Sequence, residues 1–306
     1  MRFLRFSTAT GSSLGVREGN EVIDLSLAAP DLPRDLSTLL AMGDDALQAV
    51  RNAIRRAPAQ AVRAAHELTA LTPIAQPEKI ICIGMNYAEH VKEAPSPHEL
   101  PTYPVVFLRQ ARSLVAHGEA LRRPRCSDQF DYEGELVCVI GRRAKNVPKA
   151  SALEYVGGYS LFNDASVRDY QFKSHQWTVG KNFDATGAFG PELVTADELP
   201  FGARGLTLRT TLNGETVQCA SIDDMIFDIA TLISVLSEAM TLVPGDLIVT
   251  GTPSGVGLGR KPPLWMKHGD VCTVSVDGVG TLSNPVLDEA EEPFRTRPTL
   301  APQETT

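Results

Sequence analysis

Residues 131–140 read DYEGELVCVI, so a short acidic segment runs directly into an apolar, β-branched stretch. An apolar run of this length is typical of a buried strand. Residues two apart in a strand point to the same face, so Glu133 and Glu135 are expected to stand side by side. Two carboxylates this close repel unless a cation or a shared proton lies between them. The stretch therefore predicts a strand that begins either at a cation site or at an exposed acidic edge.

Short apolar runs of the same kind recur between Gly- and Pro-containing turns from Lys79 onward. They cover residues 79–83, 135–140, 206–212 and 246–249. In this part of the chain, from Lys79 onward, only two segments are expected as helices, about 87–94 and about 224–240. The second has the helical spacing of apolar residues that is typical of a buried core helix. Many strands with so few helices predict a mixed α/β, mostly β, barrel-like domain and not a doubly wound one.

The chain before this domain reads as a small α+β unit. Short strands are expected near residues 3–6, 14–17 and 22–25, and helical stretches roughly over 36–47 and 49–68. Residues 72–77 contain two prolines, which stop a helix and favour extended chain, so they are expected to be a linker. The predicted organisation is a small N-terminal domain at 1–72, a catalytic domain at 73–288 and a flexible polar tail at 289–306.

The composition argues against several classes of protein. Of 306 residues, 29 are Lys or Arg and 37 are Asp or Glu, so the formal net charge is −8 and nucleic-acid binding is not expected. The five cysteines are scattered and form no Cys-x-x-Cys pair, which indicates neither a disulfide framework nor a zinc–thiolate site. No signal-peptide pattern and no apolar run near the roughly 20 residues that cross a bilayer is found. We therefore expect a soluble, cytoplasmic protein with no membrane partner.

Asp164 completes a candidate metal site. This acid follows the apolar stretch 155–162, which would otherwise be buried. With Glu133 and Glu135 it makes an oxygen-only ligand set, which suits a hard cation, Mg²⁺ most simply, with Mn²⁺ or Ca²⁺ as alternatives. Three protein ligands would leave about half an octahedron open for water and a chelating substrate.

A candidate general base lies in residues 83–93, which predict a strand, a glycine turn and a helix. The helix carries His90 and Glu93 three positions apart, so the carboxylate could orient the imidazole and raise its basicity. That arrangement suits activation of water, although a surface histidine beside a surface glutamate fits the spacing equally well. The Pro-rich residues 95–103 are expected to form either a movable lid or a simple loop.

Two further signals are weaker. Lys181 stands among apolar residues, so it is either a buried functional lysine or one whose ammonium reaches the surface. Residues 251–259 read GTPSGVGLG, but they lack the Gly-Lys-Ser/Thr of a phosphate loop and precede no expected helix, which argues against nucleotide binding. A turn whose backbone N–H groups and Thr252 hydroxyl face an anionic ligand remains open.

Together these segments resemble the fumarylacetoacetate hydrolase family over about residues 79–288. The resemblance rests on motifs in the expected order: Gly84-Met85-Asn86-Tyr87-x-x-His90-x-x-Glu93, Asp131-Tyr132-Glu133-x-Glu135-Leu136, Asn163-Asp164-x-Ser166-x-Arg168-Asp169-x-Gln171, Lys181-Asn182-Phe183-Asp184, Asp224-Met225-Ile226-Phe227 and Gly251-Thr252-Pro253-x-Gly255-Val256-Gly257. It implies the family's mixed β-roll with a small N-terminal α+β domain. The chain looks like a bacterial acylpyruvate hydrolase or 2-hydroxyhepta-2,4-diene-1,7-dioate isomerase of that family.

The resemblance also implies roles for single residues and for the whole chain. The implied metal ligands are Glu133, Glu135 and Asp164; the catalytic residues are His90, Glu93 and Lys181; and the substrate-binding residues are Arg168, Gln171 and Thr252. The family is usually dimeric, so a homodimer is expected.

The leading functional hypothesis is metal-dependent hydrolysis of a carbon–carbon bond in an acylpyruvate-type 2,4-diketo acid. His90, oriented by Glu93, would take a proton from water, and the metal with Lys181 would stabilise the departing enolate. The same site would equally serve decarboxylation of a 2-oxo acid such as oxaloacetate, keto–enol or double-bond isomerisation, or dehydration of a sugar-derived acid. A non-catalytic ligand-binding protein is a third reading. The expected partner in every case is a small 2-oxo acid.

Overall fold

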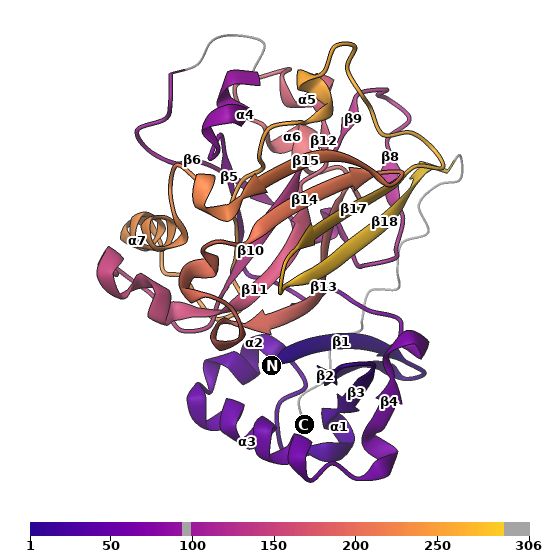
Figure 1. Cartoon of the computed structure of the whole chain (residues 1–306), viewed down its shortest axis with the longest axis vertical. Coiled ribbons are helices and arrows are strands. Elements are labelled where there is room, and N and C mark those ends of the chain that lie inside the picture. The colour runs from indigo at the N-terminus through magenta and orange to yellow at the C-terminus, as the bar shows by residue number, and fades with distance from the viewer. Residues whose placement is uncertain (94–98, 291–306) are drawn as a thin grey trace, which may run out of the picture.

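The computed structural model describes residues 1–93 and 99–290. Its main body contains two packed β-sheets, and a smaller unit formed by the N-terminal residues lies against one end of that body (Figure 1). The predicted tail at 289–306 lies outside the described residues from position 291 onward. Residues 95–98 of the expected loop or lid at 95–103 also lie outside them. The mixed, mostly β fold predicted from the sequence is confirmed.

The larger sheet extends through both units in the order β4-β3-β2-β1-β13-β11-β10-β16-β5-β6, with β7 paired to β13. Its strands are β1 (Arg2–Thr8), β2 (Gly11–Glu18), β3 (Glu21–Asp24), β4 (Val62–Ala64), β5 (Ile80–Gly84), β6 (Val105–Arg109), β7 (Leu114–Val115), β10 (Gly134–Ile140), β11 (Val156–Asn163), β13 (Gly187–Thr195) and β16 (Leu247–Val249). All residues of β10 are buried, which confirms the strand predicted from the apolar run at 135–140.

The second sheet has the order β15-β14-β17-β18-β8 and covers one face of the larger one (Figure 1). Its strands are β8 (Leu121–Arg123), β14 (Thr207–Leu212), β15 (Glu215–Ser221), β17 (Val271–Val276) and β18 (Gly280–Asp288), and the short strands β9 (Phe130–Asp131) and β12 (Ser166–Val167) pair separately. Leu136 and Leu161 of the first sheet share one buried cluster with Leu208 and Val274 of the second. The interior between the sheets is therefore the main hydrophobic core.

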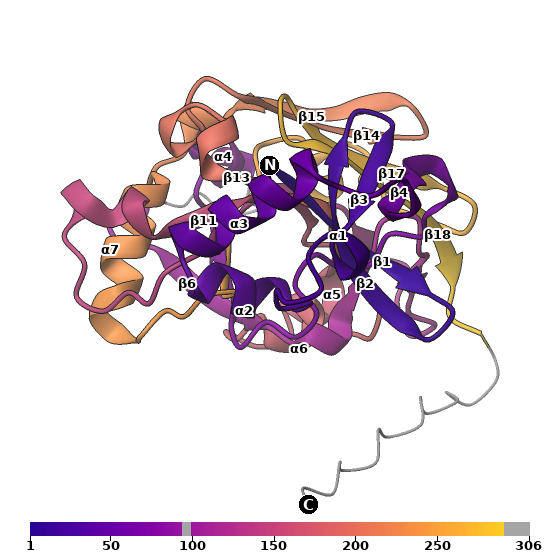
Figure 2. The same cartoon turned by 90° about the horizontal axis from the view of Figure 1, so that it is seen from below.

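The N-terminal unit adds α1 (Leu25–Ala28), α2 (Leu36–Ala41) and α3 (Asp44–Arg55) to strands β1–β4 (Figure 2). The three predicted strands are confirmed, but the helical prediction over 49–68 is wrong beyond Arg55. Pro58 fixes φ and lacks an N–H, and the chain then extends into β4. The break between α2 and α3 falls at Gly43, whose φ is +75°.

Helix α7 (Ile229–Ala239) is the buried helix expected near 224–240, but it begins later than predicted. The Asp228 carboxylate accepts a hydrogen bond from the Thr231 N–H at 2.8 Å and so caps the first turn. Residues 222–224 form a separate 3₁₀ turn, with its own cap at Ser221. No helix within residues 1–93 and 99–290 combines the length and apolarity that a membrane crossing requires.

Three short helices gather at the end of the main body that lies away from the N-terminal unit (Figure 1). They are α4 (Ala88–Glu93), which the sequence predicts, and α5 (Arg168–Gln171) and α6 (Thr178–Lys181), which it does not. Each carries at least one of the residues proposed from the sequence for the site. This end of the larger sheet is therefore where those residues meet.

Candidate active site

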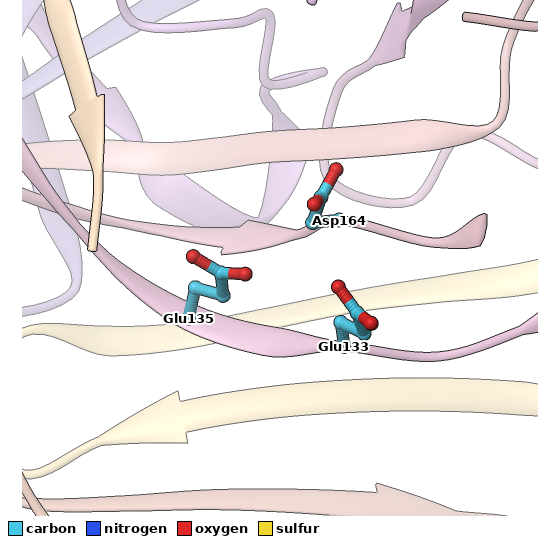
Figure 3. A group of neighbouring side chains, drawn as sticks. All are labelled: Glu133, Glu135 and Asp164. Atoms are coloured by element: carbon cyan, nitrogen blue, oxygen red, sulfur yellow. The ribbon is translucent and has the colours of Figure 1, made fainter. Parts of the chain in front are cut away.

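The three acids predicted as metal ligands come together at the ends of two neighbouring strands (Figure 3). Glu133 directly precedes β10, Glu135 lies within it, and Asp164 directly follows β11. Because Gly134 pairs with Asn163 across the antiparallel ladder, both strand ends lie at the same edge. One carboxylate oxygen from each acid lies within 4.8 Å of the other two, and all three residues are buried. This arrangement excludes the exposed acidic edge that the sequence left open.

Local backbone contacts fix these acids in place. The Asp164 N–H donates to the Glu133 carbonyl at 2.8 Å, and the Glu133 N–H donates to Asn163 Oδ1 at 3.0 Å. The residue between the two glutamates must be small, since a Cβ on Gly134 would lie 2.0 Å from Thr210 Oγ1 of the second sheet. The close approach of the two sheets thus depends on the glycine at the centre of the Glu-Gly-Glu sequence.

Buried cations already contact two of the three acids. Lys181 Nζ lies 2.6 Å from Glu133 Oε2 and 2.6 Å from Asp164 Oδ2, and Arg168 Nη1 lies 2.7 Å from Glu133 Oε1. Burial alone would raise the pKa of Glu133, but Arg168 and Lys181 outweigh it and hold that pKa at about 2. Burial likewise opposes the charge on Lys181, whereas Asp164 and Glu133 raise its pKa. Lys181 is therefore a buried ammonium and not a surface lysine.

Glu135 is in the opposite electrostatic situation. Burial, together with the charges of Asp164 and Glu133, raises its pKa well above the ordinary value. Its Oε2 accepts a hydrogen bond from the Gly251 N–H at 2.5 Å, but no basic side chain of the described residues lies within ion-pair distance of it. The three carboxylates therefore form an oxygen-only set with one uncompensated acid, and this set fits a divalent hard cation.

His90 and Glu93 of α4 line the same cavity as the three acids. His90 Nδ1 lies 3.4 Å from Glu93 Oε2, and Glu93 Oε1 accepts a hydrogen bond from the Gly255 N–H at 2.7 Å. The side chains are only 18% and 24% exposed. The pair thus faces a cavity that contains carboxylates, which is the placement a general base for that cavity needs.

The three residues expected to hold substrate oxygens also line the cavity, but each is already engaged with the protein. Arg168 bonds Asp131 and Glu133, and its Nη1 donates to Gln171 Oε1 at 2.9 Å. The Thr252 hydroxyl donates to the Gly134 carbonyl at 3.0 Å. In this arrangement Arg168 stabilises the carboxylates of the site itself.

Two residues of the site were given no role from the sequence. Asp131 binds Arg168 and also accepts hydrogen bonds from the Gly257 and Leu258 N–H groups at 2.7 and 2.9 Å, which fixes the glycine-rich loop 251–259. It stands two positions before Glu133, so strand alternation could have indicated it. Arg109, the last residue of β6, bonds Asp164 from 55 positions away, and no sequence spacing indicates that contact.

Apolar side chains form most of the remaining cavity wall. They are Ile83, Met85, Phe107, Phe172, Trp177, Val256 and Leu258. The Phe107 and Trp177 rings meet edge to face, with centroids 5.5 Å apart. Trp177 can lie there because residue 84 is glycine: a Cβ at Gly84 would be 2.3 Å from the indole. The cavity thus combines a small polar end with an apolar wall, as small-molecule sites commonly do.

Fold and site together define an enzyme with two packed sheets and a buried carboxylate triad that could bind a divalent metal. The chain belongs to the fumarylacetoacetate hydrolase family, since residues 79–287 match the domain described as Fumarylacetoacetate (FAA) hydrolase C-terminal. That span coincides closely with the residues 79–288 over which the sequence motifs occur. The family predicted from those motifs is confirmed.

Relatives of known name are similar over nearly the whole chain. The chain is 39% identical over 293 residues to "Oxaloacetate tautomerase fahd2, mitochondrial" of Xenopus laevis, covering 94% of this chain and 90% of that protein. Fumarylacetoacetate hydrolase from the psychrophilic Exiguobacterium antarcticum has a similar structure, with a TM-score of 0.80, 33% identity and coverage of 94% and 100%. Maleylpyruvate hydrolase from Sphingobium sp. SYK-6, in complex with manganese(II) and pyruvate, has a TM-score of 0.79, 26% identity and coverage of 95% and 100%.

Proposed function

We propose that the protein is a divalent-cation-dependent enzyme that interconverts the keto and enol forms of a small 2-oxo acid of the oxaloacetate type. One observation carries the proposal: a His–Glu pair and a buried carboxylate triad line a single small cavity, in a chain similar over nearly its whole length to an oxaloacetate tautomerase. This function belongs to the isomerase alternative of the sequence-based hypothesis, so hydrolysis becomes the second candidate.

Glu133, Glu135 and Asp164 would hold the cation, Mg²⁺ or Mn²⁺. When bound, the cation supplies positive charge to the carboxylate and 2-oxo oxygens of the substrate. The substrate's reactive carbon would then lie in the part of the cavity that His90 faces. Phe107 and Trp177 would exclude water from it, which strengthens the electrostatic interactions inside.

Tautomerisation needs one proton removed and one delivered. In the keto-to-enol direction, His90 would take a proton from C3, the C2=C3 double bond would form, and the 2-oxo oxygen would gain a proton. Glu93 would orient the imidazole through its contact with Nδ1. Lys181, an ammonium among carboxylates, could give the proton to the oxygen or donate a hydrogen bond to it as charge develops. The reverse direction returns each proton to its source.

Hydrolysis of an acylpyruvate-type carbon–carbon bond is the second candidate, favoured by the structural similarity to maleylpyruvate hydrolase. In that reaction His90 would take its proton from water, and the water oxygen would attack the distal carbonyl. Decarboxylation of oxaloacetate would also develop negative charge on the 2-oxo oxygen, but it would need no water. All three outcomes use one site, so they are separated by their products.

The test is an assay of purified protein, EDTA-treated and then reloaded with Mg²⁺ or Mn²⁺, on oxaloacetate and on acetylpyruvate. Loss of the enol absorbance of oxaloacetate, faster with more enzyme and without pyruvate release, is the expected result. Pyruvate formed from oxaloacetate faster than with the same metal and no enzyme would identify a decarboxylase, and pyruvate from acetylpyruvate a hydrolase. No change in either substrate, with metal shown to be bound, would contradict an enzymatic role for the site.

The homodimer and the cytoplasmic location stay predictions. A dimer of the 33.0 kDa chain would have a mass of 2 × 33.0 = 66.0 kDa, which light scattering on the purified protein measures directly.

A further inference from the structure

Arg109 is a fully buried guanidinium whose three nitrogens all have acceptors. Its Nη1 donates to Asp164 Oδ1 at 2.5 Å and to the Ala165 carbonyl at 3.1 Å. Its Nη2 donates to Thr186 Oγ1 at 3.0 Å, and its Nε donates to Ser113 Oγ at 3.2 Å. The side chains of Arg109 and Asp164 are both 0% exposed. Such a charge is stable in the interior only when its partners are placed correctly.

The surroundings of Arg109 are arranged to receive it. The Thr186 hydroxyl donates its own proton to the Phe183 carbonyl at 2.7 Å, and the Ser113 hydroxyl donates to the Gln110 carbonyl at 2.8 Å. Each hydroxyl therefore presents a lone pair to the guanidinium. A Cβ on Gly187 would lie 2.7 Å from Nη2, so the glycine leaves the space that the guanidinium fills.

This arrangement gives the two oxygens of Asp164 different partners. Oδ1 is held by Arg109, whereas Oδ2 contacts Lys181 Nζ. Lys181 and Asp164 line the cavity, but Arg109 is not among its lining residues. Arg109 thus holds the carboxylate from behind, on the side away from the space a ligand would enter.

We propose that Arg109 is a positioning residue that fixes Asp164 as a one-oxygen metal ligand, with Oδ2 directed into the cavity. The inference rests on the proposed cation site. The orientation of the Asp164 carboxylate matters as well as its charge, because a carboxylate that is free to rotate loses the fixed direction that a metal ligand needs. Partners that orient metal ligands typically change metal affinity 10–100-fold when they are altered.

Arg109→Lys separates geometry from charge. A lysine keeps the positive charge, but its single ammonium cannot reproduce the planar fork that reaches Asp164, Thr186 and Ser113 together. Removing the charge altogether would confuse the result, since the loss of a nearby cation by itself favours metal binding. Thr186→Val is a milder variant, because it preserves side-chain shape and removes a single hydroxyl, which accepts from Nη2 and donates to the Phe183 carbonyl.

The experiment is titration of the EDTA-treated full-length protein with Mn²⁺, followed by electron paramagnetic resonance, with circular dichroism to check folding. The unchanged protein and Arg51→Lys, which alters an ion pair with the exposed Asp197, serve as controls. We expect Arg109→Lys to bind Mn²⁺ at least tenfold more weakly, with an altered spectrum of the bound ion. Thr186→Val should show a smaller change in the same direction, and Arg51→Lys none.

Unchanged Mn²⁺ affinity and an unchanged spectrum in folded Arg109→Lys would overturn the positioning role and leave the metal site standing. If that variant does not fold, Thr186→Val decides alone: a result equal to that of the unchanged protein overturns the inference. If the unchanged protein itself binds no Mn²⁺, the proposed metal site is wrong and the role of Arg109 is wrong with it.

Discussion

Glu93 Oε1 accepts a hydrogen bond from the backbone N–H of Gly255 at 2.7 Å, across 162 positions of sequence. The other oxygen of the same carboxylate faces His90 Nδ1. One side chain therefore ties helix α4 to the glycine-rich loop and orients the candidate base. The position of that base depends on the loop as well as on its own helix.

Glu93→Gln should separate these two tasks. The amide oxygen can still accept the Gly255 N–H, so the loop should remain in place, but the carboxylate oxygen that faces His90 Nδ1 is lost. We expect kcat to fall by about 100-fold, at the low end of the 10²–10⁴-fold contribution of general acid–base catalysis, with little change in Mn²⁺ affinity. Steady-state kinetics and Mn²⁺ titration test this. Glu89→Gln is the matched control on the same helix, since Glu89 is 71% exposed; an equal loss in both variants would contradict a specific role.

Lys181→Met removes the ammonium that lies between Glu133 and Asp164. Breaking a buried ion pair from one side typically costs about 3–5 kcal/mol, because the remaining charges are left uncompensated. We expect a large drop in Tm in EDTA and a larger Mn²⁺-induced rise in Tm than the unchanged protein shows, since the metal would replace the lost charge. Thermal unfolding with and without Mn²⁺ measures both. Equal Mn²⁺ effects in the two proteins would show that Lys181 and the metal do not share the same carboxylates.

Glu133→Gln and Glu135→Gln should change the stability of the metal-free protein in opposite directions. Arg168 and Lys181 lower the pKa of Glu133 from 4.5 to about 2 on folding, so its charge stabilises the fold above pH 4.5. This stabilisation is lost as the pH falls toward 2. The pKa of Glu135 is raised on folding, so its charge opposes folding above pH 4.5 and this penalty grows with pH.

At pH 7 in EDTA, therefore, Glu133→Gln should lower Tm and Glu135→Gln should raise it. Both variants should lose most of the Mn²⁺-induced rise in Tm, because each removes a proposed ligand. Scanning calorimetry with and without metal distinguishes these effects. Shifts of the same sign in the metal-free variants would contradict the electrostatic description of the site.

Gly134→Ala tests the close approach of the two sheets. Its Cβ would lie 2.0 Å from Thr210 Oγ1 and 3.2 Å from the Val274 methyl groups. Overpacking of this kind typically costs about 1–3 kcal/mol, and here it would also displace the neighbouring glutamates. We expect a lower urea midpoint, and partial recovery when Thr210→Ala is added because the clashing atom is removed. No recovery in the double variant would place the strain elsewhere.

The sequence predicted the parts of the fold that depend on local pattern. The run at 135–140 has the composition of a buried strand, and the structure confirms it as β10. Residues 49–68 are rich in Ala, Leu and Arg, but the helix ends at Arg55 because Pro58 is a stronger local signal than that composition. Helix α7 begins at Ile229 and not near 224 because Asp228 caps its first turn, which is also a local signal.

The site was predictable where its residues are close in sequence or belong to a family motif. Strand alternation placed Glu133 beside Glu135, and helical spacing placed His90 beside Glu93. Arg109 could not be found in this way, because three strands separate β6 from β11 in the sheet, and its contact with Asp164 arises only from the tertiary fold. The engagement of Arg168 by Asp131 and Glu133 is likewise a product of tertiary packing.

The pairing of β1 with β13 has a consequence for the recombination of this protein with its relatives. Phe3 pairs with Leu193, and β13 in turn pairs with β11, the strand that ends at Asp164. A chimera joined near residue 72 would exchange β1, the strand that pairs with β13, along with the rest of residues 1–72. If the incoming strand did not match, the main-chain groups of β13 would be left open to pair with other molecules. A transferable module therefore needs the first strand of the chain together with residues 73–288.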